Sequence, residues 1–257
     1  MTIGIMTAMP EEAHLLASEL SREKEHVHGG RTYYTGELSG HRIVLVFSRM
    51  GKVAAAATAQ HLIDAHQVRA IIFSGVAGAL RHDLHIGDIV VGERLWQHDM
   101  DASPLFPALE IPLLGVSSFA ADPTIRDRLR TCCERFFRNG FAAEVGMNAA
   151  AELGIRNPQV VVGDIVSGDR FVATHAQRES LRSLVPTALC VEMEGGAVAQ
   201  VCYEHGIPLG VVRVISDRAD DGAHVDFGKF VRDAASRYGL GIIKRFLDLE
   251  RVARTSR

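Results

Sequence analysis

The feature that most constrains the fold is a series of short apolar runs in which polar and apolar residues do not alternate. These runs occupy residues 2–8, 70–75, 88–96, 160–169, 188–192 and 208–217. A strand that is apolar on both faces is typical of a sheet covered by helices on both sides. The pattern therefore predicts an α/β protein.

The segments between these runs predict the helices and one hairpin. Residues 31–48 read as two strands around a turn at Ser39 and Gly40. The mixed-charge stretch 21–26 is expected to be solvated surface. Neither a Ser/Gly/Pro-rich linker nor a repeat is present, so we predict one domain over residues 1–249 and a frayed tail over 250–257. Apolar spacing and helix start and stop signals predict helices over residues 10–20, 51–66, 122–140 and 227–249.

Composition and charge exclude several classes of protein. The 257 residues are 47% hydrophobic and 23% charged, and the formal net charge of −3 argues against a nucleic-acid partner. There is no secretory signal and no run of about 18 apolar residues, so we expect a cytoplasmic protein without a membrane partner. The four cysteines are expected to be reduced core residues: Cys132, Cys133, Cys190 and Cys202.

The sequence also predicts that no cofactor or metal is bound. Only Gly75 and Gly78 stand where a dinucleotide fingerprint needs three glycines, and Val53 stands where a P-loop needs Ser or Thr. The twelve histidines are scattered without an H-E-x-x-H motif or a close Cys/His cluster, so zinc is not expected.

Carboxylates recur just beyond the predicted strands. In open α/β sheets, ligands bind at the carboxyl ends of the strands. A single such carboxylate is more often a helix cap, but several in one sheet, two of them with an arginine nearby, favour a ligand site. The segments concerned are Glu12, Ser74–Gly78, Asp169, Glu194 and Asp217.

Seven segments, in order along the chain, carry a family resemblance. Together they resemble the nucleoside phosphorylase/hydrolase family, and within it the 5′-methylthioadenosine/S-adenosylhomocysteine nucleosidases. The resemblance implies a single α/β domain around a twisted mixed sheet, usually a homodimer in the nucleosidase branch. The segments are "GIMTAMPEE" (4–12), "SRMGKVAAA" (48–56), "SGVAGAL" (74–80), "GDIVV" (87–91), "SGDRF" (167–171), "VEMEGGAVA" (191–199) and "VRVISDRAD" (212–220).

The resemblance implies a role for the carboxylates. Cleavage of an N-ribosidic bond needs an acid at the base, an acceptor for the ribose hydroxyls and an activated water at C1′. By resemblance, Asp217 is the acid for adenine N7 and Ser216 helps to hold it. Glu194 resembles the acceptor of the ribose hydroxyls, Met193 the apolar floor under the sugar, and Glu12 the base that orients the water.

The remaining site residues are also assigned by resemblance. Arg213 is expected close to Glu12, and Glu192 is expected to support Glu194. Phe171 would stack on adenine, and the backbone of Val172 would read the edge of the base. Three further residues would surround the 5′-alkylthio group, namely Met9, Met50 and Phe227.

Two segments depart from the family pattern. Val76 stands where the nucleosidases usually have a hydroxyl residue. The loop 102–115 occupies the place where a dimer partner lends an aromatic and a proline, which Phe106 and Pro112 match approximately. We expect this apolar loop to pack across a two-fold interface and to close the partner's pocket.

The reaction class is predicted to be hydrolysis of 5′-alkylthioadenosines. A phosphorylase needs cationic and hydroxyl donors for phosphate, whereas this chain has Glu11 and Glu12 in the first loop and Val76 in the glycine segment. A hydrolase of futalosine-type nucleosides remains an alternative. A non-catalytic storage or binding protein is disfavoured because all the carboxylates and Arg213 are present.

Overall fold

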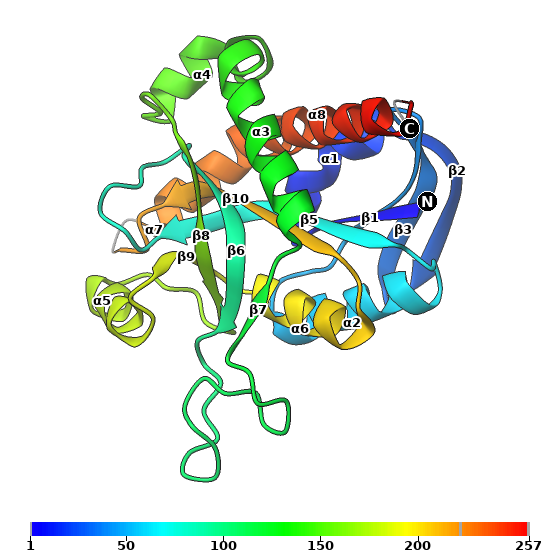
Figure 1. Ribbon diagram of the computed structural model, residues 1–257. Coiled ribbons are helices and arrows are strands. Elements are labelled where there is room, and N and C mark those ends of the chain that lie inside the picture. The colour runs from blue at the N-terminus through cyan, green and yellow to red at the C-terminus, as the bar shows by residue number, and fades with distance from the viewer. Residues whose placement is uncertain (1, 221–222, 256–257) are drawn as a thin grey trace.

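Figure 1 shows the computed structural model of the chain, whose structure is described for residues 2–220 and 223–255. The strands are β1 (Thr2–Thr7), β2 (Ser21–His28), β3 (Arg31–Leu38), β4 (His41–Phe47), β5 (Ala70–Ala79), β6 (Ile89–Gln97), β7 (Ser118–Ala120), β8 (Val160–Ser167), β9 (Ala188–Glu192) and β10 (Leu209–Asp217). The helices are α1 (Pro10–Glu19), α2 (Lys52–Asp64), α3 (Pro123–Asn139), α4 (Met147–Glu152), α5 (His175–Leu184), α6 (Gly195–His205), α7 (Ala223–Phe230) and α8 (Ser236–Thr255). Two π-helical turns, Ala142–Gly146 and Val231–Ala235, precede α4 and α8.

All the described strands belong to one mixed sheet, part of which closes on itself. The strand order is β10-β6-β8-β9-β5-β1-β4-β3-β2, and β10 also pairs with β5. Strands β5, β10, β6, β8 and β9 therefore form a closed ring. Strands β1, β4, β5 and β10 run in one direction, and β6, β8 and β9 run in the other.

Strand β5 exchanges neighbours halfway along its length, and this exchange creates a fork in the sheet. On one side, β5 pairs with β1 as far as Phe73 and with β9 only from Gly78 onward. Between these two ladders, residues 74–77 face an opening. Because β9 runs antiparallel to β5, the end of β9 arrives at the same place as the end of β1.

Helices cover both faces of the sheet (Figure 1). Helices α1, α3 and α8 enclose one apolar core, in which Leu16, Leu129 and Ile242 are buried. Helices α2 and α6 enclose the second core through residues such as Ala59 and Val198. The small side chains on α2 and α6 allow these two helices to pack close to each other.

The α/β prediction, with a central mixed sheet flanked by helices, is confirmed, but some boundaries were wrong. The glycine-containing segment 74–78 lies inside β5 rather than beyond it. In the charged stretch 21–26, Ser21, Lys24, Glu25 and His26 are exposed, as expected, but the stretch belongs to the edge strand β2. The predicted closing helix is divided into α7 and α8, and α8 continues to Thr255, past residue 249. The division into a domain of residues 1–249 and a tail stays a prediction.

Two further observations concern the cysteines and the helices. All four cysteines are buried and unpaired, as predicted. Among the described helices, none is both long enough and apolar enough to cross a membrane.

Candidate active site

A pocket of about 580 Å³, its open mouth included, lies at the fork beside β5. Every residue to which the family resemblance assigns a place in this chain's own site lines it: Met9, Glu12, Met50, Val76, Phe171, Val172, Glu192, Met193, Glu194, Arg213, Ser216, Asp217 and Phe227. Three more lining residues, Gly75, Ala77 and Gly78, belong to the segment 74–78 that the sequence also places at a ligand site, and the sequence analysis did not single out Ala8, Arg170 and Val191. The ends of strands that run in opposite directions therefore meet at one cavity.

The carboxylate of Glu12 accepts hydrogen bonds from backbone N–H groups at the fork. It is the third residue of α1 and only 3% exposed. Its Oε2 accepts hydrogen bonds from the N–H groups of Ala8 (2.8 Å) and Met9 (2.9 Å), and its Oε1 accepts one from Val76 (3.1 Å). Val76 lies where β5 has no strand neighbour on that side, so this carboxylate takes the place of a ladder partner. Burial raises the pKa of Glu12, while Arg213 and these N–H groups oppose that rise.

Two glycines of β5 leave room for the carboxylates. A Cβ on Gly75 would lie 3.0 Å from Glu12 Oε1 and 3.4 Å from Arg213 Nη1. A Cβ on Gly78 would lie 2.7 Å from Asp217 Oδ1. The glycines of this strand thus permit close approach of charged side chains to the backbone.

Arg213 and Glu192 form a buried ion pair beneath the pocket. The Arg213 side chain is 1% exposed, and its Nη2 lies 2.7 Å from Glu192 Oε2. Its Nη1 donates to the carbonyls of Phe73 and Val212, both at 3.1 Å, and its guanidinium lies 4.1 Å from the centre of the Phe73 ring. The ion pair of Arg213 is therefore with Glu192; toward Glu12 it acts as a nearby charge.

Glu192 is held from its other side by the start of α6. Its carboxylate accepts hydrogen bonds from the N–H groups of Gly195 (2.8 and 3.0 Å) and Glu194 (3.2 Å). Ser167 Oγ also donates to Glu192 and accepts from Gly196 N at 2.7 Å. Glu192 thus contacts the backbone of Glu194, the neighbour that the resemblance expects it to support. Ser167 was missed, although it opens the "SGDRF" motif.

Glu194 presents a carboxylate with spare acceptor capacity. It is 5% exposed, and its Oε1 accepts a 2.8 Å hydrogen bond from Gly51 N. Burial, followed by the neighbouring Glu192 carboxylate, raises the pKa of Glu194 to about 8. A carboxyl group in this position can accept hydroxyl donors from a ligand, which favour its ionised form.

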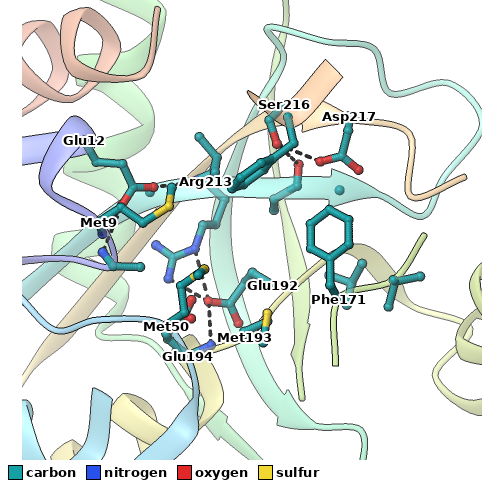
Figure 2. Close-up of a pocket in the computed structure, with 18 of the residues that line it drawn as sticks. Met9, Glu12, Met50, Phe171, Glu192, Met193, Glu194, Arg213, Ser216 and Asp217 are labelled. Atoms are coloured by element: carbon teal, nitrogen blue, oxygen red, sulfur yellow. Dashed lines mark hydrogen bonds and ion pairs between the residues drawn. The ribbon is translucent and has the colours of Figure 1, made fainter. Parts of the chain in front are cut away.

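Asp217 is the last residue of β10 and is 2% exposed. Its Oδ2 accepts a 2.8 Å hydrogen bond from Ser216 Oγ, and its Oδ1 accepts one of 2.8 Å from Ala219 N. Figure 2 shows Glu12 and Asp217 at opposite ends of the view, with Arg213 between them. The two carboxylates can therefore act on different ends of one ligand.

The apolar side chains around the mouth suit a flat ring and a small hydrophobic group. Phe171 and Phe227 meet edge to face, with ring centres 5.6 Å apart, although 56 residues separate them in the chain. Phe171 is 41% exposed and Met50 is 58% exposed. A ligand between them would bury apolar surface on both sides.

Asp169 and one residue of the loop 102–115 make contacts that the sequence did not indicate. Asp169 does not line this pocket; its Oδ1 accepts a 2.7 Å hydrogen bond from Lys52 N at the start of α2. In the loop 102–115, Ile111 is 4% exposed and packs in the core beneath α2 and α6, so it is not available to a partner. The exposed apolar residues of that loop are Leu105 and Leu113.

The closed, mixed sheet and its carboxylate-lined pocket define an α/β enzyme that acts on a small ligand with a flat ring and hydroxyl groups. The chain belongs to the phosphorylase superfamily, whose family profile matches residues 2–248.

Curated relatives and solved structures are similar over nearly the whole chain. The 5′-methylthioadenosine/S-adenosylhomocysteine nucleosidase of Mycobacterium bovis is 34% identical over 244 residues, which cover 91% of this chain and 92% of the relative. The nucleosidase of the same name from Neisseria meningitidis, solved with methylthio-immucillin-A, superposes with a TM-score of 0.85 at 29% identity and covers 96% of this chain and 99% of that one. The futalosine hydrolase of Helicobacter pylori has a TM-score of 0.80 at 32% identity and covers 96% and 97%.

Proposed function

We propose that this protein is an N-glycosyl hydrolase that cleaves 5′-methylthioadenosine and S-adenosylhomocysteine into adenine and the corresponding thio-ribose. The observation that carries the proposal is a pocket with buried carboxylates at both ends and in the middle, without a free buried cation among the described lining residues. The curated relatives with this name support the choice of substrate.

Each group has a role that fits its position. Asp217, oriented by Ser216, delivers a proton to adenine N7, which removes the negative charge that builds up on the leaving base. Phe171 stacks on the base, and the backbone of Val172 contacts its edge. Glu194 accepts the ribose hydroxyls through its spare oxygen.

Glu12 orients and deprotonates the attacking water. Its three N–H donors hold the carboxylate in place, and each oxygen retains acceptor capacity for a water molecule. Met193 lies under the sugar, and the 5′-alkylthio group lies in the wall formed by Met9, Met50 and Phe227.

The surroundings of Glu12 favour water over phosphate as the nucleophile. Of the described lining residues, Arg170 and Arg213 carry a positive charge. Arg213 is buried and paired with Glu192, and Arg170 is exposed. An anionic nucleophile next to Glu12 would thus meet a carboxylate without a free buried cation to offset it.

The product of the reaction tests this choice. Methylthioadenosine is incubated with the enzyme with and without phosphate, and the sugar product is identified. We expect free methylthioribose at equal rates in both. Glu12→Gln should lower kcat by about 10²- to 10⁴-fold with little change in binding. Sugar phosphate as product, or faster turnover of Glu12→Gln in phosphate, would instead show a purine nucleoside phosphorylase.

A futalosine-type nucleoside is the second candidate substrate. A surface hollow lined by Arg31, Arg49 and Asp169 adjoins the pocket and shares Met50 with it. This hollow leaves space for a larger 5′ group than a methylthio group. A comparison of kcat/KM for methylthioadenosine and futalosine decides between the two.

The assembly and location are proposed from the sequence. The loop between β6 and β7 projects from the body of the protein (Figure 1), and its Leu105 and Leu113 are 83% and 91% exposed. Exposed apolar side chains on a projecting loop favour a homodimer in which the loop meets the partner. A cytoplasmic location stays a prediction.

A further inference from the structure

Four histidines gather at the end of α2 that points away from the pocket. Helix α2 begins next to Gly51, which donates to Glu194, and His61 lies in its last turn. His66 follows just after the helix, and His26 and His28 lie on the edge strand β2. The 13 residues of α2 span about 20 Å. The cluster is therefore remote from the nucleoside pocket.

The rings are close enough to share one ion. His26, His28 and His61 each offer a ring nitrogen, and these atoms all lie within 4.8 Å of one another. The rings of His28 and His61 are parallel, with centres 3.9 Å apart. His26 and His28 are two residues apart in a strand, so they project on the same side of the sheet. The expectation that the histidines form no close cluster was therefore wrong.

Two of the nitrogens in this cluster are buried without a hydrogen bond. The Nε2 atoms of His61 and His66 have no partner among the described residues. The two rings lie 5.4 Å apart, and both contact the ring of Tyr33. A buried polar atom without a partner is uncommon in a folded protein, and a bound ion is one recognised reason for it. This observation is independent of the spacing of the other histidines.

We propose that His26, His28 and His61 bind a divalent transition-metal ion of the zinc type, with His66 beside them as a further nitrogen donor. Imidazole nitrogens suit Zn²⁺, Cu²⁺ and Ni²⁺, whereas Mg²⁺ and Ca²⁺ prefer oxygen ligands. Nitrogens bound to zinc at about 2.0–2.1 Å lie about 3.4 Å apart in a tetrahedral site. Rotation of the exposed His26 and His28 rings closes the remaining gap.

The place of the cluster in the fold also agrees with metal binding. An ion held by His26, His28 and His61 would join β2, the outermost strand of the sheet, to the end of α2. Its role is structural, because no residue of the cluster lines the nucleoside pocket.

Titration of the metal-free protein with Zn²⁺ tests the proposal. Isothermal titration calorimetry should show one ion per chain with a Kd on the order of micromolar or tighter, and Co²⁺ should give the visible absorption of a tetrahedral site. His26→Gln with His28→Gln should weaken binding at least tenfold. Both side chains are exposed, so the variant should fold and retain nucleosidase activity.

The matched control replaces two exposed histidines elsewhere. His82→Gln with His85→Gln removes side chains that are 60% and 58% exposed and should bind zinc like the wild type. At a hundredfold excess of Zn²⁺ over Kd, the Tm of the wild type and of this control should rise by about 5 °C, and that of the His26/His28 variant should not. No saturable binding up to about 100 μM Zn²⁺, or equal affinity in both double variants, would overturn the proposal and leave the rings as packing residues.

Discussion

Glu194 is buried next to a second carboxylate, Glu192. Its negative charge therefore lowers the stability of the fold, although it favours binding of the nucleoside hydroxyls. The pKa of Glu194 is about 8, because burial and then Glu192 disfavour the ionised form. The unfolded chain releases this proton near pH 4.5, whereas the folded chain retains it until about pH 8. The stability of the folded state therefore falls as the pH rises through this window.

Glu194→Gln should therefore raise the Tm relative to the wild type, and more at pH 8.5 than at pH 5. The amide oxygen can still accept from Gly51 N, but no buried charge forms. Loss of the carboxylate should raise the KM for nucleoside. Differential scanning fluorimetry at both pH values and steady-state kinetics measure these effects. A Tm difference that does not change with pH contradicts the assignment.

At Asp217, Asp217→Asn should retain the fold and lose turnover. The amide oxygen can accept one of the two hydrogen bonds, from Ser216 or Ala219, but the side chain cannot deliver a proton. We expect kcat to fall by about 10²- to 10⁴-fold. The comparison needs circular dichroism as well as kinetics. A variant within twofold of the wild-type kcat would remove Asp217 from the mechanism.

At the scale of elements, the pocket depends on strands β1, β9 and β10, which pair with β5 and end beside it. Glu192 ends β9 and Arg213 lies within β10, so their ion pair connects two strands of the closed ring beneath the pocket. Strand β5 lies close to Glu12, Arg213 and Asp217, and its glycines leave room for these side chains.

Arg213→Gln should lower the free energy of unfolding by about 3–5 kcal/mol, because Glu192 would be left buried without its cation. Glu192→Gln with Arg213→Gln should be less destabilised than the sum of the two single changes. Urea unfolding of the four proteins gives the coupling energy. Strict additivity would mean that the two side chains do not depend on each other.

Gly78→Ala should displace Asp217, since the new Cβ would lie 2.7 Å from Asp217 Oδ1. We expect a fall in kcat with a smaller change in stability. Gly228→Ala is the control, because its Cβ would meet nothing nearer than Arg232 Nη1 at 3.7 Å. Equal kcat values for Gly78→Ala and the control would show that the strand tolerates a side chain there.

At the scale of the whole molecule, the proposed homodimer rests on the projecting loop between β6 and β7. Part of its apolar sequence is used internally, because Ile111 is buried in the core. Leu105 and Leu113 remain exposed, and they are the residues for which a partner surface would remove apolar area from water.

Light scattering at micromolar concentration should give twice the mass of the 28.0 kDa chain. Leu105→Glu with Leu113→Glu should shift the mass toward that of one chain, because charges at the interface oppose association. Val27→Glu, at a residue 67% exposed on β2, should have no such effect. A wild-type mass of one chain would contradict the homodimer.

The sequence alone determined the fold class and, through the family resemblance, most of the residues that line the pocket. Apolar runs without alternation predict a sheet covered on both faces, because burial on each side leaves no position for polar side chains. Local motifs likewise place Glu12, Glu194 and Asp217 next to strand ends. Each of these features depends on residues close together in the sequence, so each can be predicted without the tertiary structure.

Only the tertiary structure decided which strand ends meet and which charges pair. Antiparallel pairing of β9 with the end of β5 brings Glu192 to Arg213, and the opening between β1 and β9 lets Glu12 satisfy Val76 N. It also excludes Asp169 from the pocket and brings His28 of β2 against His61 of α2. Strand order and the closure of the sheet depend on contacts between residues far apart in the chain, and local patterns carry no record of those contacts.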